Sequence, residues 1–272
     1  MRNPVTRVEN IARAGFFARG VVYILLGYFA FTGAQMAKDG TSGVLKHIAE
    51  VPGGYWLLAM VAIGLAAYGF FRLYDAALNL EPSGEGWKAT LKRIGHAASG
   101  VAHLALAVTA VKLIMDSRAQ AGGERQQEAA AGLLNLPFGS VVLGAIAIGF
   151  LFAALEQLRS AWTGRFMRNL DADAPPFTDK IGRAGYAARS VVFFLIGYAL
   201  IKAAWFTNSD QVQGVGGALM ELRDMGWAYP LTAIGLLLFG VFSLIMGKYR
   251  RIRDEDVIAR LKHMHMGNGT NG

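Results

Sequence analysis

Six long stretches of this 272-residue sequence contain almost no Asp, Glu, Lys or Arg. They cover residues 20–37, 51–71, 94–111, 129–155, 190–209 and 225–247, and only Lys202 interrupts them. About 20 apolar residues in a helix cross a hydrocarbon core of about 30 Å. Backbone groups in that core must be satisfied internally, and the alternating pattern of a membrane barrel is absent. The sequence therefore predicts an all-α integral membrane protein with six transmembrane helices.

The start of the first apolar stretch recurs along the chain. Residues 11–28 and 181–198 are identical at 11 of 18 positions, and both carry an Arg-x-Gly motif followed by a second arginine. A weaker copy lies between them, in which Arg93, Gly95 and Gly100 match Arg13, Gly15 and Gly20. Because one copy is internal, the first one is expected to be a retained helix and not a cleaved leader.

The second helices repeat as well. Pro52-Gly53-Gly54 in the first unit corresponds to Pro137-Phe138-Gly139 in the second, each just before an apolar helix. Each unit is therefore a helical hairpin, and two spans restore the original side of the membrane. The chain is expected to form three parallel helical-hairpin repeats with approximate threefold symmetry about the membrane normal.

The expected repeats have these boundaries. Repeat 1 covers 1–80 with spans at about 17–37 and 54–74, repeat 2 covers 81–165 with spans at 94–115 and 137–158, and repeat 3 covers 166–250 with spans at 185–207 and 227–247. Residues 251–272 are expected to be a charged cytoplasmic tail whose last residues are disordered. Small residues at four-residue spacing, Ala145, Gly149 and Ala153, are expected to let helices approach closely.

The basic residues set the expected orientation. The net charge is +8, but the Lys and Arg residues flank apolar stretches instead of forming a basic face on a soluble fold, so a nucleic acid partner is not expected. With the N-terminus inside, 20 of the 27 Lys and Arg residues lie on the cytoplasmic side. Both termini are therefore expected in the cytoplasm. The chain has no cysteine, which excludes disulfides and thiolate chemistry.

The repeated Arg-x-Gly motif, the Pro/Gly start of the second helix and the three hairpins together resemble a bacterial membrane-protein family. This family is catalogued as a domain of unknown function, number 1206, and the resemblance covers residues 8–250. It implies a six-span protein of three paired-helix repeats in the bacterial cytoplasmic (inner) membrane. It carries over no activity, cofactor or binding residue. The middle unit departs most, with His96, Ser99 and His103 where the first unit has Phe16, Arg19 and Tyr23.

Five arginines are candidate binding residues for an anion or a lipid headgroup. Arg13, Arg93 and Arg183 lie at the cytoplasmic ends of equivalent helices, and Arg19 and Arg189 lie six residues further in. One interpretation is that they fix the topology and reach lipid phosphates from the helix ends. The other is that they surround the symmetry axis and bind an anion, since guanidinium groups bind phosphate in a bidentate manner.

A second group contains intramembrane polar candidates. Its members are His96, His103, Lys112, Lys202 and Glu156. His96 and His103 are seven residues apart, so they share one helix face at a separation of about 10 Å. Bis-histidine haem ligation needs two helices, and no other predicted span contains a histidine, so neither haem nor a metal site is expected. Arg72 and Asp75 are expected to form a local pair, and no second carboxylate or histidine falls at a spacing that would build an acid/base pair.

Several function classes stay open. The zinc-helix, phosphate-loop and nucleophile-elbow motifs are missing, which favours a protein that is not an enzyme. Mid-span polar residues are few, which disfavours a high-flux pathway. The first hypothesis is a non-enzymatic bundle that binds anionic lipid, a small ligand or a protein partner, including a homo- or hetero-oligomeric one. The alternatives are a small transporter or channel with a pathway on the axis or between repeats, and a haem or redox protein.

Overall fold

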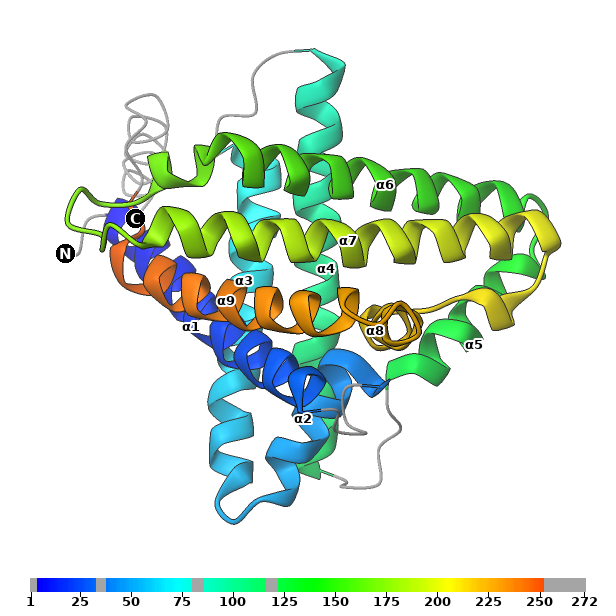
Figure 1. Ribbon diagram of the computed structural model, residues 1–272, viewed down its shortest axis with the longest axis horizontal. Helices are drawn as coiled ribbons and strands as arrows, with labels where there is room; N and C mark the ends of the chain where they lie inside the picture. The colour runs from blue at the N-terminus through cyan, green and yellow to red at the C-terminus, as the bar shows by residue number, and fades with distance from the viewer. Residues whose placement is uncertain (1–3, 33–37, 80–85, 116–121, 252–272) are drawn as a thin grey trace, which may run out of the picture.

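The computed structural model describes residues 4–32, 38–79, 86–115 and 122–251 (Figure 1). Over these residues the chain forms nine α-helices and no strand. Six helices are long and apolar enough to cross a membrane, as predicted. They are α1 (Pro4–Phe31), α3 (Gly54–Leu78), α4 (Trp87–Met115), α6 (Gly139–Thr163), α7 (Thr178–Phe206) and α9 (Ala228–Tyr249). The expected cytoplasmic tail falls, after Arg251, outside the described residues.

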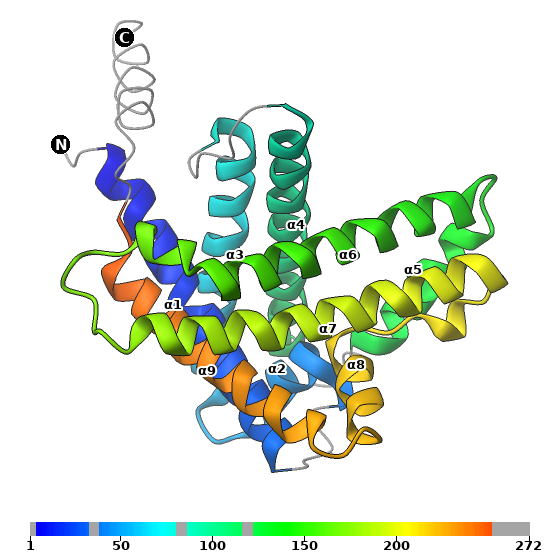
Figure 2. The same ribbon diagram turned by 45° about the horizontal axis from the view of Figure 1, so that its top comes forward.

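Three short helices precede the second long helix of each repeat. They are α2 (Gly40–Glu50), α5 (Gly122–Leu134) and α8 (Val215–Arg223), and two 3-10 turns, η2 (Arg165–Asn169) and η3 (Ser209–Gln211), complete the described elements. The short helices are anchored by apolar side chains such as Leu45 and Leu219, both fully buried. Because α2 contacts both α5 and α8, the three short helices lie next to one another (Figure 2).

The second helices begin in the same way in repeats 1 and 2. Gly53 and Phe138 adopt positive φ angles of 76° and 62°, which turn the chain into α3 and α6. The following glycines cannot be replaced. A Cβ on Gly54 would lie 1.7 Å from the carbonyl oxygen of Ile48, and one on Gly139 would lie 1.8 Å from that of Leu133. The Pro-x-Gly motif therefore encodes a shared local geometry.

The long helices pair in a cyclic order that reflects the repeats. The second long helix of each unit packs along the first long helix of the next, which gives the pairs α3–α4, α6–α7 and α9–α1. Glycines sit at all three crossings, and at the α6–α7 crossing a Cβ on Gly197 would lie 3.2 Å from the carbonyl oxygen of Ala147. A Cβ on Gly240 would lie 2.5 Å from the backbone nitrogen of Ile24, and one on Gly100 would lie 2.9 Å from the carbonyl oxygen of Gly69. Ser190, which takes the place of Gly20 and Gly100 in repeat 3, adds a hydrogen bond from its hydroxyl to the carbonyl of Ala154 at 2.9 Å.

The two long helices of one repeat pack along each other only in repeats 1 and 3. There α1 packs on α3 and α7 on α9, and a Cβ on Gly64 or Gly235 would lie 2.4 Å from the Cβ of Ala18 or Ala188. The corresponding helices of repeat 2, α4 and α6, do not pack along each other. The prediction that Gly149 serves close helix packing is wrong for this arrangement, because nothing lies within 4 Å of its Cβ position. The reason is that α6 packs on α7 while α4 packs on α3.

Candidate functional site

Arg19 is a buried arginine in the middle of the long helices, with 6% of its surface exposed. Its Nε donates a hydrogen bond to Oγ of Ser243 at 3.2 Å, and its Nη1 donates to the hydroxyl of Tyr68 at 2.6 Å. Ser243 in turn donates to the carbonyl of Phe239. Arg19 therefore ties α1 to both α3 and α9 through polar contacts.

Aromatic rings surround the same guanidinium. Its carbon lies 4.6 Å from the ring centre of Phe16, 4.9 Å from that of Tyr68 and 4.8 Å from that of Phe239. A cation over an aromatic face is attracted by the ring quadrupole, and this attraction is strongest where water is excluded. The rings therefore offset part of the cost of burying the charge.

Arg189 is the repeat-equivalent arginine of α7, and it is less well satisfied. Its guanidinium carbon lies 4.4 Å from the ring centre of Phe239 and 4.9 Å from that of Phe193. Its Nε is buried without a hydrogen-bond partner. Among the described residues, no carboxylate pairs with Arg19 or Arg189, although both guanidinium groups lie over the ring of Phe239. The buried Arg19 and the partly buried Arg189 thus lie together without a carboxylate partner among the described residues.

His103 joins this group from α4. Its ring packs edge-on against Tyr68 with centroids 4.5 Å apart. Its Nδ1 lies 2.7 Å from the carbonyl oxygen of Ser99, and because a carbonyl only accepts, Nδ1 is the donor. The hydroxyl of the same Tyr68 accepts the hydrogen bond from Arg19, so His103 and Arg19 contact one shared side chain. The first long helix of every repeat therefore contributes one basic side chain to a central cluster, which we define as Arg19, Arg189 and His103.

The three arginines of the repeated motif lie elsewhere and share one structural role. Each donates to backbone carbonyls at the end of the neighbouring second helix. Arg13 donates to the carbonyl of Arg250 at 3.1 Å and 3.3 Å. Arg93 donates to those of Ala76 at 2.7 Å and Ala77 at 3.0 Å. Arg183 donates to those of Ala161 at 3.2 Å and Trp162. The last carbonyls of a helix lack partners within it and carry partial negative charge, so these contacts cap α9, α3 and α6.

A second buried polar group connects α3 and α4. The carboxylate of Asp75 is fully buried, and its Oδ2 lies 3.1 Å from Nη1 of Arg72, which is the predicted local pair. It also lies 2.7 Å from Nδ1 of His96. The sequence spacing did not indicate this contact between a histidine and a carboxylate, because helix packing brings together residues that are distant in the sequence.

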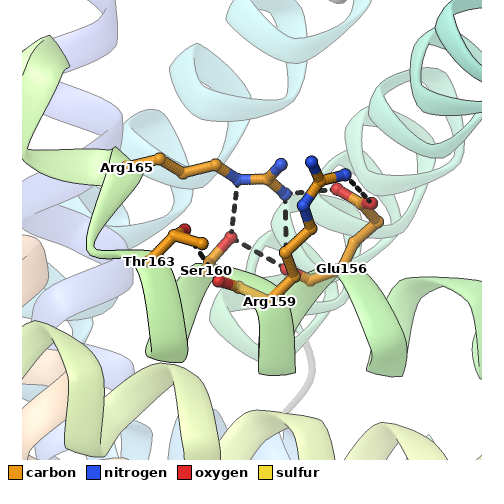
Figure 3. A network of polar contacts seen from close by, with 5 residues as sticks. All are labelled: Glu156, Arg159, Ser160, Thr163 and Arg165. Atoms are coloured by element: carbon orange, nitrogen blue, oxygen red, sulfur yellow. Dashed lines mark hydrogen bonds and ion pairs between the residues drawn. The ribbon is translucent and has the colours of Figure 1, made fainter.

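Glu156 belongs to a network at the end of α6 (Figure 3). It pairs with Arg165 of η2 and, at 3.7 Å, with Arg159, while Nε of Arg165 donates to the hydroxyl of Ser160 at 3.2 Å. Of the two candidate lysines, Lys112 is exposed at the end of α4 and Lys202 lies over the ring of Tyr198. No group of three or more metal-ligating residues occurs in the described part of the chain.

Six apolar helices arranged in three paired repeats define a multi-pass helical membrane protein. The chain belongs to the family described as Domain of Unknown Function (DUF1206), whose sequence model matches residues 14–79, 94–164 and 184–250, once in each repeat. It is 32% identical over 259 residues to the uncharacterized protein YxxB of Bacillus subtilis (strain 168), covering 91% of this chain and 93% of that protein. No solved structure matches the chain.

Proposed function

We propose that this protein is a non-enzymatic membrane protein that binds an anionic group at the central cluster. The observation that carries the proposal is the buried Nε atom of the partly buried Arg189, which lacks a hydrogen-bond acceptor and lies near the buried guanidinium of Arg19. An unpaired charge in a dry interior is costly, and a buried donor without an acceptor adds to that cost. An anion between Arg19 and Arg189 would relieve both.

Phosphate is the favoured chemistry of that anion. Guanidinium groups hold phosphate oxygens through paired, charge-assisted hydrogen bonds. The expected topology places the cluster within the cytoplasmic half of the bilayer, where anionic lipids give the surface a negative potential. The headgroup of an anionic lipid is therefore the proposed ligand, and free phosphate has the same recognition chemistry.

The test uses Arg189, because its replacement removes no hydrogen bond within the described residues. Arg189→Gln is expected to lose most of the anionic lipid that co-purifies with the protein in native mass spectrometry, whereas Arg189→Lys keeps part of it. Arg223→Gln, at an exposed arginine that is expected outside, is the control and should change nothing. Unchanged lipid occupancy in a monodisperse Arg189→Gln protein would contradict the proposal.

The two sources of phosphate are separated with purified protein in nanodiscs. Thermal unfolding is followed in phosphatidylcholine discs with and without inorganic phosphate, and in phosphatidylglycerol discs. A higher melting temperature with phosphatidylglycerol alone favours the lipid headgroup, and one with inorganic phosphate in phosphatidylcholine favours the free ion. The Arg189→Gln protein should show neither increase.

A transport pathway is the second candidate, and the separation of α4 from α6 beside the central cluster supports it. Against it, the repeat-equivalent Val22 and Val192 are both only 2% exposed, so apolar side chains fill the space one turn beyond Arg19 and Arg189. Phosphate uptake into proteoliposomes that exceeds the empty-vesicle rate would favour transport over binding. A haem role loses support because His96 contacts Asp75 and both histidines lie on the same helix.

A further inference from the structure

Repeat 2 is the repeat whose two long helices, α4 and α6, do not pack along each other. In repeats 1 and 3, two small-residue contacts join the hairpin. The first is Gly64 on Ala18 and Gly235 on Ala188. The second brings Gly15 against the backbone of Tyr68, and Gly185 against that of Phe239, with the added Cβ 2.6 Å and 2.7 Å from the Cα atoms.

Repeat 2 has small residues at all the corresponding positions. Gly149 and Ala98 correspond to the first contact, and Gly95 and Ala153 to the second. Nothing lies within 4 Å of the Cβ position of Gly95 or Gly149. Small residues at matched positions are what close helix contact in a membrane requires. The two faces are therefore complementary by the same rule that joins the other hairpins, yet they do not touch.

Burial shows the same imbalance. In the most apolar 18-residue segment of α4 only 22% is buried, and in that of α6 only 17% is. The corresponding share is 44% to 56% in the other four long helices. The helix pairs also diverge, because α3 and α4 run steeply to α6 and α7 in both views (Figures 1 and 2). Transmembrane helices tilt on average about 20° from the bilayer normal. Bringing α6 and α7 toward α4 would align the pairs within one bilayer.

We propose that α4 and α6 close against each other, with Gly149 facing Ala98 and Gly95 facing Ala153, and that the separated arrangement is the open state of the protein. Closure completes the ring α1–α3–α4–α6–α7–α9, whose other five contacts are already made. Each helix is thus the partner of the other's unpaired face.

Closure of α4 on α6 would also enclose a headgroup bound at the central cluster, and this part of the inference depends on the proposed function. In repeats 1 and 3 an arginine lies over an aromatic ring of the second helix, Arg19 over Tyr68 and Arg189 over Phe239. Repeat 2 has the small residues Ser99 and Ala153 at the positions that the arginine and the aromatic residue occupy in the other two repeats. A closed hairpin there leaves room for a headgroup beside the two arginines. The open state admits an anionic lipid from the side, and the closed state encloses its headgroup.

The experiment measures the distance between α4 and α6 by double electron–electron resonance. The chain has no cysteine, so two spin labels can be attached without removing any residue. Val101→Cys and Ile148→Cys place them on exposed positions, 61% and 65% accessible. Val191→Cys and Ile234→Cys are the repeat-equivalent control in the closed third repeat, each 41% accessible.

In phosphatidylcholine nanodiscs the repeat 2 pair is expected to show two distances, one longer and one equal to that of the control pair. Gly95→Leu with Gly149→Leu should remove the shorter distance and leave the control pair unchanged. A single long distance for repeat 2, unaffected by these substitutions, would overturn closure. No anionic lipid and no inorganic phosphate is added, so this result does not depend on the proposed function.

A second arm tests the enclosing role. Phosphatidylglycerol is expected to raise the fraction of the shorter distance, and Arg189→Gln should abolish that rise. If the shorter distance occurs but its fraction does not respond to phosphatidylglycerol, closure stands and its role in enclosing a headgroup is overturned.

Discussion

Nδ1 of His96 in α4 lies 2.7 Å from Oδ2 of Asp75 in α3, inside a helix pair that the hydrogen bonds of Arg93 to Ala76 and Ala77 also join. Asp75 has no exposed surface, and Arg72 approaches the same oxygen at 3.1 Å. A contact of this kind is satisfied at only one relative position of the two helices. The carboxylate therefore sets the register of α4 on α3 as well as compensating the charge of Arg72.

Replacing this carboxylate is expected to be costly. Asp75→Asn removes the negative charge and leaves Arg72 and His96 partly buried beside a neutral amide, which should destabilise the protein by about 3 kcal/mol. His96→Gln, which leaves the Arg72 pair intact, should cost clearly less. Melting temperature in detergent, followed by tryptophan fluorescence, measures both. Equal melting temperatures for Asp75→Asn and the unmodified protein would contradict this role.

The capping arginines allow a graded comparison. Arg93→Gln loses two hydrogen bonds to carbonyls at the end of α3, at a position open to water, and should cost about 1 kcal/mol. Arg183→Gln should cost more, because Arg183 also pairs with Asp179 at 2.8 Å. Thermal unfolding of the two variants under the same conditions checks the order. The reverse order would argue against capping as the main role of these residues.

The long helices and the repeats could be predicted from the sequence because both are local properties. Apolar length decides which segments cross a membrane, and the Pro-x-Gly motif forces the same turn before α3 and α6. The Arg72–Asp75 pair was predictable for the same reason, since three residues on one helix fix the distance. The candidate arginines were found because they recur in the repeats.

The contact between Asp75 and His96 could not be predicted, because it depends on the register of two helices joined by a loop. The difference in hydrogen bonding between Arg19 and Arg189 could not be predicted from the sequence either. Both occupy the same place in the repeat, but Arg19 finds Tyr68 and Ser243 as acceptors, whereas Nε of Arg189 finds none. The separation of α4 and α6 runs against the pattern of small residues, so a repeat-based argument predicts the closed hairpin.

Replacing a glycine at a helix crossing by alanine is expected to destabilise the protein. Gly27→Ala in α1 would place a Cβ 2.5 Å from the backbone nitrogen of Leu237, and Gly240→Ala in α9 would place one 2.5 Å from that of Ile24. Backbone cannot move aside cheaply, so each substitution should destabilise the protein by about 1–3 kcal/mol. Gly132→Ala in α5 meets nothing within 4 Å and should be neutral or slightly stabilising, as expected for alanine in a helix. Melting temperatures check the three variants together, and a neutral Gly27→Ala would show that α1 and α9 are not in close contact in the membrane.

The orientation in the membrane can be tested with single cysteines, because the chain contains none of its own. The distribution of Lys and Arg predicts that both termini and the segment between α6 and α7 are cytoplasmic and that α2 faces outward. Glu50→Cys and Ala172→Cys replace exposed residues on the two sides. A membrane-impermeant maleimide should label Glu50→Cys in intact spheroplasts, whereas Ala172→Cys should react only after lysis. Labelling of Ala172→Cys in intact spheroplasts, or strong activity of a periplasm-active reporter fused after Gly272, would reverse the orientation. In that case the central cluster would lie in the outer leaflet, where the cytoplasmic surface potential does not attract its proposed ligand.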